Sequence, residues 1–205
     1  MTTEDTFRTI AGATEASFNE KRSKFIAFAH PVTTHEEIKE LLDHYQREFY
    51  NARHVCYAYM LGYKQEDFRA NDDGEPSGTA GRPILGQIRS NELTDVLVVV
   101  VRYFGGIKLG TGGLVVAYKT AAALALEAAE VLEKTVNDEL TIHFEYPFLN
   151  EVMRIVKDEE ATMVEQDFML DCKLTLRIRR SKYSQLKERL ELIESVKVID
   201  EKIAE

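Results

Sequence analysis

Two short stretches of this sequence concentrate side chains that can do chemistry. The first, DDGEPSGTAGRP at residues 72–83, holds three carboxylates, two hydroxyls and one arginine. The second, RYFGGIKLGTGG at residues 102–113, holds five glycines, one arginine and one lysine. A simple connection needs only a glycine or two and some polar surface. Both stretches are therefore candidate functional loops.

The acidic stretch admits three interpretations. Asp72 and Asp73 offer the oxygen ligands that Mg²⁺ prefers. Two carboxylates can also serve as a general acid and a general base. Alternatively, the acids cap helices, form Asx-turns and pair with arginines, so that the stretch is an ordered turn. The residue types alone favour this last interpretation.

The glycine-rich stretch predicts an anion-binding site. Its glycines allow backbone N–H groups to approach a ligand, and the helix predicted to follow adds unpaired N–H groups and partial positive charge. Arg102, Lys108 and Lys119 add full positive charges. The stretch matches neither G-x-x-x-x-G-K-[ST] nor G-x-G-x-x-G, which argues against the common nucleotide-binding loops.

The other candidate residues are few. His54 stands beside Arg53 at the start of a predicted strand, and its role depends on whether the fold brings it near Asp72 or Arg102. The remaining histidines lack metal-ligand spacing, and no G-x-S-x-G motif occurs, so we assign no catalytic residue and no metal site. The candidate binding residues are His54, Asp72, Asp73, Glu75, Ser77, Thr79, Arg82, Arg102, Tyr103, Gly105, Gly106, Lys108, Gly110 and Lys119.

Strands and helices must position these loops. Ten of the eleven glycines lie between Gly62 and Gly113, which places the tightly turned backbone in the first part of the chain. Thr34 and Glu37 form a capping-box pattern that predicts the start of a helix. The patterns predict strands at 24–29, 54–61 and 96–101, and helices after Thr34, from Pro83 and at 114–132.

The second part of the chain follows a different pattern. A polar stretch at 133–138 predicts a linker, and beyond it the predicted elements run β-α-β-β-α-β, the ferredoxin-like order. We therefore expect two α+β domains, residues 1–134 and 135–205. The strand near 170–179 carries Lys173, Arg177 and Arg179 on its polar face. This pattern favours a solvated sheet face over an RNA- or protein-docking face.

Composition narrows the class of protein. Hydrophobic residues make up 44% of the chain and charged residues 30%, as in soluble globular proteins. No apolar run reaches the roughly 20 residues of a membrane span, and the first ten residues are unlike a secretory signal. Cys56 and Cys172 lie in apolar runs without C-x-x-C spacing, which indicates reduced thiols in a cytoplasmic protein.

Charge argues against a general polyanion binder. The net charge is −9, and both parts are acidic: residues 1–134 hold 15 basic and 19 acidic side chains, and residues 135–205 hold 11 and 16. A protein that binds nucleic acid over its whole surface is usually basic. A local basic patch remains compatible with these numbers.

Taken together, the two loops resemble those of the YigZ/IMPACT family. The resemblance is carried by DDGEPSGTAGRPIL at 72–85 and VVVVRYFGGIKLGTGGLVVAY at 98–118, and it extends to EKRSKFI at 20–26 and ARHVCYAY at 52–59. It covers most of residues 15–130. It implies a first domain like the second domain of ribosomal protein S5 and a ferredoxin-like second domain. It also implies a link to translational control, because eukaryotic members act there, but it supplies no catalytic assignment.

Two hypotheses of function follow. In the first, the chain is a translation-linked regulatory or binding protein, without a cofactor, that contacts RNA, the ribosome or a translation protein through the two loops. In the second, it is an enzyme that binds a phosphorylated small molecule or nucleotide in the same cleft, with Mg²⁺ at Asp72 and Asp73. Kinases of a related fold carry a Ser-Ser-Ala element where this chain has TGG at 111–113, so the first hypothesis is favoured. The oligomeric state is left open.

Overall fold

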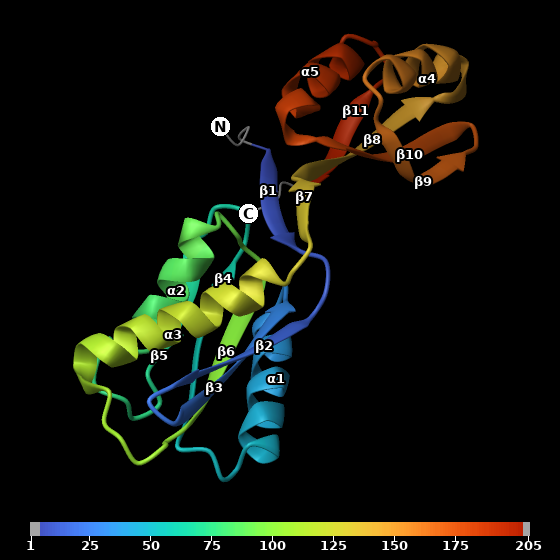
Figure 1. Ribbon diagram of the computed structural model, residues 1–205. Helices are drawn as coiled ribbons and strands as arrows, with labels where there is room; N and C mark the ends of the chain where they lie inside the picture. The colour runs from blue at the N-terminus through green and yellow to red at the C-terminus, as the bar shows by residue number, and fades with distance from the viewer. Residues whose placement is uncertain (1–4, 203–205) are drawn as a thin grey trace. The chain divides into compact units, whose positions relative to one another are not determined.

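The computed structural model describes residues 5–202. The chain forms two compact units (Figure 1). One is Phe7–Lys134; the other runs from Thr135 onward and includes Asp5 and Thr6. Within the described residues, no helix is long and apolar enough to cross a membrane.

The first unit is built on a five-stranded antiparallel sheet with the strand order β2-β3-β6-β4-β5. The predicted run at 96–101 is the central strand, and all six of its side chains are fully buried. They alternate between two hydrophobic clusters, one on each face of the sheet. The strands are β2 (Thr14–Glu20), β3 (Ser23–Pro31), β4 (His54–Leu61), β5 (Asp67–Asn71) and β6 (Val96–Tyr103).

Three helices cover this sheet (Figure 1). α1 (His35–Glu48) packs on one face through Ile38 and Tyr45. α2 (Gly81–Ser90) and α3 (Gly110–Glu127) pack on the other, in the cluster that holds Val98 and Val100. The predicted capping box of α1 is confirmed: Thr34 accepts from the Glu37 backbone N–H, and the Glu37 side chain accepts from the Thr34 backbone N–H.

Two predicted boundaries are wrong. α3 begins at Gly110 rather than 114 and ends at Glu127, so three of the loop glycines belong to its first turn. The polar stretch expected to be a linker at 133–138 is partly a strand, β7 (Val131–Thr135), which pairs with β1 (Thr6–Ile10). A strand that pairs with a partner more than 100 residues away leaves little local signal in its sequence.

The second unit has the ferredoxin-like β-α-β-β-α-β order, and its antiparallel sheet has the order β11-β8-β10-β9. The predicted α+β fold is thus confirmed. The elements are β8 (Asn137–Glu145), a 3₁₀ turn (Tyr146–Phe148), α4 (Leu149–Asp158), β9 (Thr162–Phe168), β10 (Asp171–Arg179), α5 (Arg180–Glu191) and β11 (Lys197–Lys202).

Ion pairs neutralise much of the basic strand in this unit. Arg177 donates to Glu139 at 2.7 Å, and Arg179 binds the buried Asp5 through Nε at 2.6 Å and Nη2 at 2.9 Å. These contacts support the solvated-face interpretation rather than RNA docking. They also explain why Asp5 lies with the second unit, although the sequence division placed it in the first.

Candidate functional site

The acidic loop is shaped by Asp72. Its two carboxylate oxygens accept three backbone N–H groups, from Gly78 at 2.8 Å, Ala80 at 3.0 Å and Gly81 at 2.8 Å. Burial raises the pKa of Asp72, but the three N–H donors outweigh it, so the pKa lies below its ordinary value. Two of these donors open α2, and Asp72 therefore caps that helix as well as closing the loop.

Asp73 joins the same loop to strand β4. Its Oδ2 accepts from the Val55 backbone N–H at 2.6 Å, and its carbonyl lies 2.6 Å from His54 Nδ1. Since a carbonyl only accepts, His54 Nδ1 carries the hydrogen, and Nε2 is the nitrogen left to face the loop. The structure therefore uses both aspartates to build the loop.

Glu75 lies beneath the surface, in a polar cluster. Its Oε1 accepts from Arg102 Nη1 at 2.5 Å and from Tyr118 Oη at 2.8 Å, and His54 Nε2 is 3.8 Å away. The side chains of Glu75 and Arg102 are only 4% and 6% exposed. Burial is the main factor that raises the pKa of Tyr118, so the Tyr118 hydroxyl stays protonated and donates to Glu75.

Arg102 has hydrogen-bonding capacity to spare. Its Nε is buried and has no hydrogen-bond partner among the described residues. The guanidinium lies 5.7 Å from the Phe25 ring and 5.6 Å from the Phe104 ring, in cation–π range of both. One nitrogen, Nη1, is committed to Glu75. Arg102 is thus only partly satisfied by the protein.

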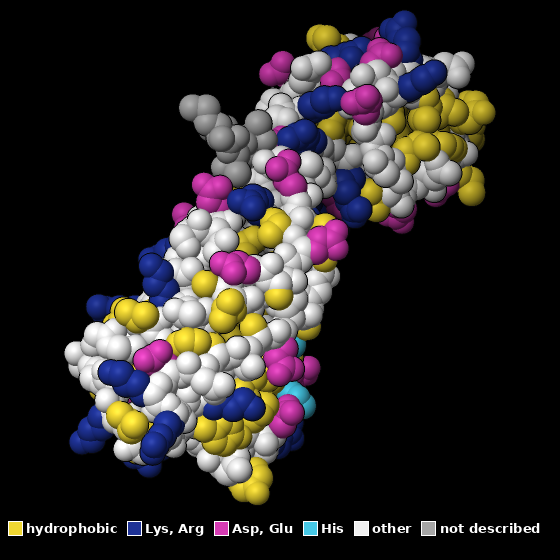
Figure 2. Space-filling view, viewed as in Figure 1, with side chains coloured by type: hydrophobic (Ala, Val, Ile, Leu, Met, Phe, Trp, Pro, Cys, Tyr) yellow, Lys and Arg dark blue, Asp and Glu magenta, His cyan; other side chains and the backbone are white. Residues whose placement is uncertain are grey.

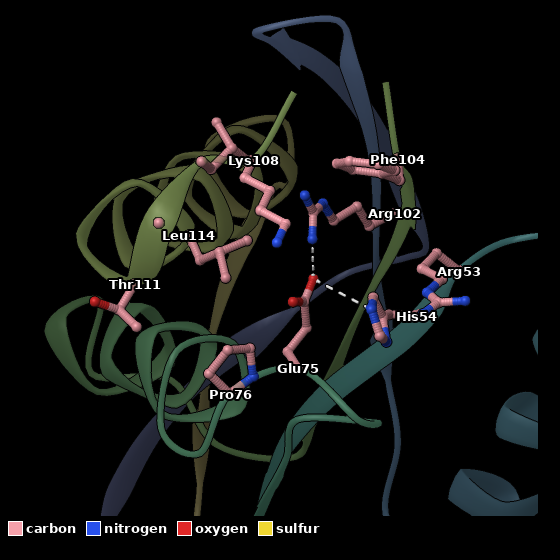
Figure 3. Close-up of a pocket in the computed structure, with 11 residues that line it drawn as sticks. Arg53, His54, Glu75, Pro76, Arg102, Phe104, Lys108, Thr111 and Leu114 are labelled. Atoms are coloured by element: carbon pink, nitrogen blue, oxygen red, sulfur yellow. Dashed lines mark hydrogen bonds and ion pairs between the residues drawn. The ribbon is translucent and has the colours of Figure 1, made fainter. Parts of the chain in front are cut away.

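The two loops meet at a pocket of about 510 Å³ directly over this cluster (Figure 3). Figure 3 shows the Lys108 side chain extending toward the Arg102 guanidinium. With His54 neutral, three cations and one carboxylate leave the pocket a net charge of +2. The lining residues are Arg53, His54, Glu75, Pro76, Arg102, Phe104, Lys108, Leu109, Gly110, Thr111 and Leu114.

The start of α3 faces this pocket. Leu109 occupies the N-cap position and makes no side-chain cap, so no N-cap side chain occupies the first N–H groups of this 18-residue helix in the described part of the chain. The helix dipole adds partial positive charge at this end. The pocket thus combines lysine and arginine charges, backbone donors and apolar walls, which suits a ligand with an anionic group and a flat or apolar part.

Part of the predicted site converges and part does not. His54, Glu75, Arg102, Lys108 and Gly110 line the pocket. The other predicted residues are absent from its lining: Asp72, Asp73, Ser77, Thr79, Arg82, Tyr103, Gly105, Gly106 and Lys119. Several of them have contacts that hold the loops in place.

Three such contacts illustrate the structural roles. Thr79 Oγ1 donates to the Pro76 carbonyl at 2.6 Å. Tyr103 Oη donates to Asn51 at 3.0 Å. At Gly105, a Cβ would lie 2.0 Å from the Arg22 backbone, so only glycine fits that close approach.

Sequence reasoning missed the apolar half of the pocket and its supporting tyrosine. Phe104 is 47% exposed, which is unusual for a phenylalanine next to a buried strand. Arg53 adjoins the predicted residue His54, and Phe104 adjoins the predicted residues Tyr103 and Gly105; this adjacency was the available signal. Tyr118 gave no signal, because one tyrosine in an alanine-rich helix is typical of a core position.

The magnesium hypothesis gains no support from the loop geometry. In the part of the chain from residue 5 to residue 202, no group of three or more His, Cys, Asp or Glu residues is arranged to hold a metal ion. Both oxygens of Asp72 face N–H donors, and Asp73 Oδ2 does too. An oxygen that accepts from an N–H group is poorly placed to coordinate a cation as well.

Comparison with known proteins agrees with the loop motifs. A family model of the Impact N-terminal domain matches residues 21–126, which include both loops and the whole pocket. A solved structure titled "Crystal structure of an hypothetical protein" is similar over 96% of this chain and 98% of its own, with a TM-score of 0.71 and 28% identity. The overall architecture is therefore shared with a known protein.

Two bacterial relatives match most of the chain. IMPACT family member YvyE of Bacillus subtilis is 35% identical over 157 residues, covering 77% of this chain and 72% of that protein. IMPACT family member YigZ of Escherichia coli is 32% identical over 172 residues, covering 83% of this chain and 84% of its own. With the motifs and these matches in agreement, the chain belongs to the IMPACT family.

Proposed function

We propose that this chain is a translation-linked binding protein that contacts single-stranded RNA through the pocket between its two glycine-rich loops. The observation that carries the proposal is the composition of the pocket, with a net charge of +2 beside an exposed aromatic ring, Phe104. Single-stranded RNA is bound by cations that meet its phosphates and by aromatic rings on which its bases stack. The link to translation rests on the family resemblance.

A binding role fits the site better than a catalytic one. The carboxylates that could act as acid and base are already engaged: Asp72 and Asp73 hold the loop, and Glu75 is paired with Arg102. The cationic side chains at the rim, Arg53 and Lys108, are exposed and available to a ligand. In this proposal, a base stacks on Phe104 while a phosphate lies near Lys108 and the start of α3.

Fluorescence anisotropy with a labelled single-stranded RNA over a salt series tests this function. Phe104→Ala should weaken binding by about 1–3 kcal/mol, as for lost base stacking. Lys108→Ala should reduce the slope of log K against log salt by about 0.7. Ile107→Ala and Lys119→Ala are matched controls, because both side chains are exposed but absent from the pocket lining. Absence of salt-dependent binding by the wild type would overturn the proposal.

One observation favours a second candidate, an enzyme acting on a phosphorylated small molecule. The hydrogen bond to the Asp73 carbonyl orients His54 so that Nε2, which has a lone pair in the neutral ring, faces Glu75 and the pocket. This arrangement is typical of a histidine that acts as a general base. A thermal-shift screen of nucleotides and phosphorylated metabolites, with and without Mg²⁺, separates the two candidates.

The two candidate functions predict different outcomes of the thermal-shift screen. A substrate present at 100 times its Kd would stabilise the protein by about 2.7 kcal/mol. Any hit should then be consumed by the wild type and not by His54→Asn. A flat screen together with RNA binding counts against the enzyme.

A further inference from the structure

A second groove lies on the first unit between strand β5 and helix α2. It has a volume of about 520 Å³ and is lined by Phe68, Arg69, Ala70, Arg82, Leu85, Gly86 and Arg89. We call these residues the arginine groove. Three of the seven are arginines and none is acidic. In a chain with a net charge of −9, such a local excess of positive charge calls for an explanation.

The three arginines keep their charge unpaired. Within residues 5–202, none of them has an acidic partner within ion-pair distance, whereas Arg102, Arg177 and Arg189 all do. The positive charge of Arg82 does lower the pKa of Asp72, after burial and the backbone donors. However, the oxygens of Asp72 are occupied by backbone N–H groups. The guanidinium groups therefore remain free to bind an anion.

Two of the arginines share one side of helix α2, next to Phe68 of β5. Arg82 and Arg89 are seven residues apart on α2, close to two helical turns, so they share a helix face. Arg69 of the edge strand β5 pairs with Tyr59, so its side chain lies on the opposite face of the sheet, which α1 covers, and it is not counted among the phosphate ligands. Figure 2 shows dark-blue lysine and arginine side chains over the part of the first unit where Figure 1 places α2.

An exposed aromatic ring completes the groove. Phe68 is 46% exposed, and the Arg89 guanidinium lies 4.4 Å from its ring centroid. A planar guanidinium and an aromatic ring together form a surface on which a nucleobase can stack. An acidic peptide would use the arginines but would have no need of this stack.

Gly86 leaves room in the groove that the fold does not require. It lies in the interior of α2, where glycine is the poorest helix former apart from proline. A Cβ at this position would meet no atom within 4 Å, and the backbone conformation is not left-handed. Packing and backbone geometry therefore do not account for a glycine here, but a ligand that approaches the helix closely would.

We propose that the arginine groove is a second contact for single-stranded RNA, with Arg82 and Arg89 on phosphates and a base on Phe68. This inference rests on the proposed function in that it takes the same ligand, but it uses separate residues. Arginine suits this role because its planar fork matches phosphate oxygens and stacks on aromatic rings. Arg82, which the sequence suggested as a binding residue of the first loop, lines this groove while its side chain also lies against Gly78 of that loop.

The test measures binding of a labelled single-stranded RNA by anisotropy over a salt series. Arg82→Ala and Arg89→Ala should each reduce the slope of log K against log salt by about 0.7, and the double variant by about 1.4. Gly86→Gln should weaken binding while it preserves or raises the melting temperature, because glutamine is a better helix former. Arg47→Ala, on the exposed side of α1, is the control and should bind as the wild type does.

The outcomes separate this inference from the proposed function. If the groove variants keep the wild-type slope while Phe104→Ala weakens binding, the groove proposal is wrong and the pocket stands. If the groove variants lose slope while Phe104→Ala and Lys108→Ala do not weaken binding, the groove stands and the pocket role fails. If polyglutamate binds with equal affinity and displaces the RNA, the groove is a site for acidic protein segments and the RNA proposal is overturned.

Discussion

Glu75 competes with any anionic ligand for Arg102. It supplies the single negative charge in the pocket lining, and it holds the guanidinium through Nη1 at 2.5 Å. A phosphate that enters the pocket must share Arg102 with this carboxylate. The Glu75–Arg102 ion pair therefore sets how strongly the pocket attracts anions. Removing the negative charge of Glu75 should lower the stability of the protein and strengthen its binding of anions.

We predict that Glu75→Gln lowers the stability of the protein by about 3 kcal/mol, because it leaves a buried guanidinium without its counter-charge. The same variant should gain more melting temperature from inorganic phosphate than the wild type does, since Arg102 becomes available to the ion. Differential scanning fluorimetry over a phosphate titration measures both effects. Glu139→Gln, which releases the half-exposed Arg177, is the control and should gain nothing extra. An equal phosphate response in all three proteins would contradict the prediction.

Asp72 should make the first unit sensitive to acid. Because its pKa is depressed in the folded state, its carboxylate stabilises the fold fully above about pH 4 and loses this effect as the pH falls through the folded-state pKa. Asp72→Asn should cost about 1.5–3 kcal/mol at pH 7, and the difference from the wild type should shrink below pH 4. Urea unfolding at a series of pH values measures it. Asp43→Asn, on the exposed face of α1, should be indistinguishable from the wild type at every pH.

At the level of single residues, the sequence identified several residues that line the pocket, but it did not show which residues hold the loop in place and which face a ligand. His54, Arg102 and Lys108 were identified because ionisable side chains beside glycine turns are conspicuous. The roles of Asp72 and Asp73 were not accessible, because a carboxylate that caps backbone N–H groups and one that binds a ligand have the same letter in the sequence. Only the contacts distinguish them.

Helix α3 shows how far patterns predict an element. The alanine-rich run from Leu114 onward predicted the helix, but its first turn was assigned to the loop because GTGG is a poor helix-forming sequence. Packing of the helix against β2 and β3 overrides this propensity. The end of the helix was misplaced for the opposite reason, since VLEKT has helix-forming residues but pairs as strand β7.

The glycines around α3 should therefore differ sharply in their tolerance of a side chain. Gly105→Ala should destabilise the protein by more than about 3 kcal/mol, because the new Cβ would overlap the Arg22 backbone. Gly112→Ala, in the first turn of α3, should be neutral or stabilise by up to about 1 kcal/mol, since a Cβ there meets no atom within 4 Å. Guanidinium unfolding of both variants checks this. Equal destabilisation by both would show that the close approach at Gly105 is misjudged.

For the whole molecule, the compact units do not follow the chain in a simple order. Asp5 lies near the start of the sequence, yet it is 2% exposed in the unit that otherwise begins at Thr135. It accepts from Arg179 and from the Ser181 backbone N–H, and these hydrogen bonds hold the pKa of Asp5 well below its usual range. A boundary drawn from composition at one point in the sequence could not include a residue 130 positions upstream.

The second unit should thus depend on Asp5 for part of its stability. Asp5→Asn keeps the shape of the side chain but removes its charge, and it should cost about 1.5–3 kcal/mol, as for a lost charge-assisted hydrogen bond. Hydrogen exchange of the full chain, followed by mass spectrometry, should show faster exchange in β10 and α5 and unchanged exchange in β6. Glu160→Gln is the control, because Glu160 is 79% exposed in its pair with Lys182 and such pairs contribute little. Unchanged protection in β10 would mean that Arg179 and Ser181 are held without Asp5, and that the second unit is complete from Thr135 onward.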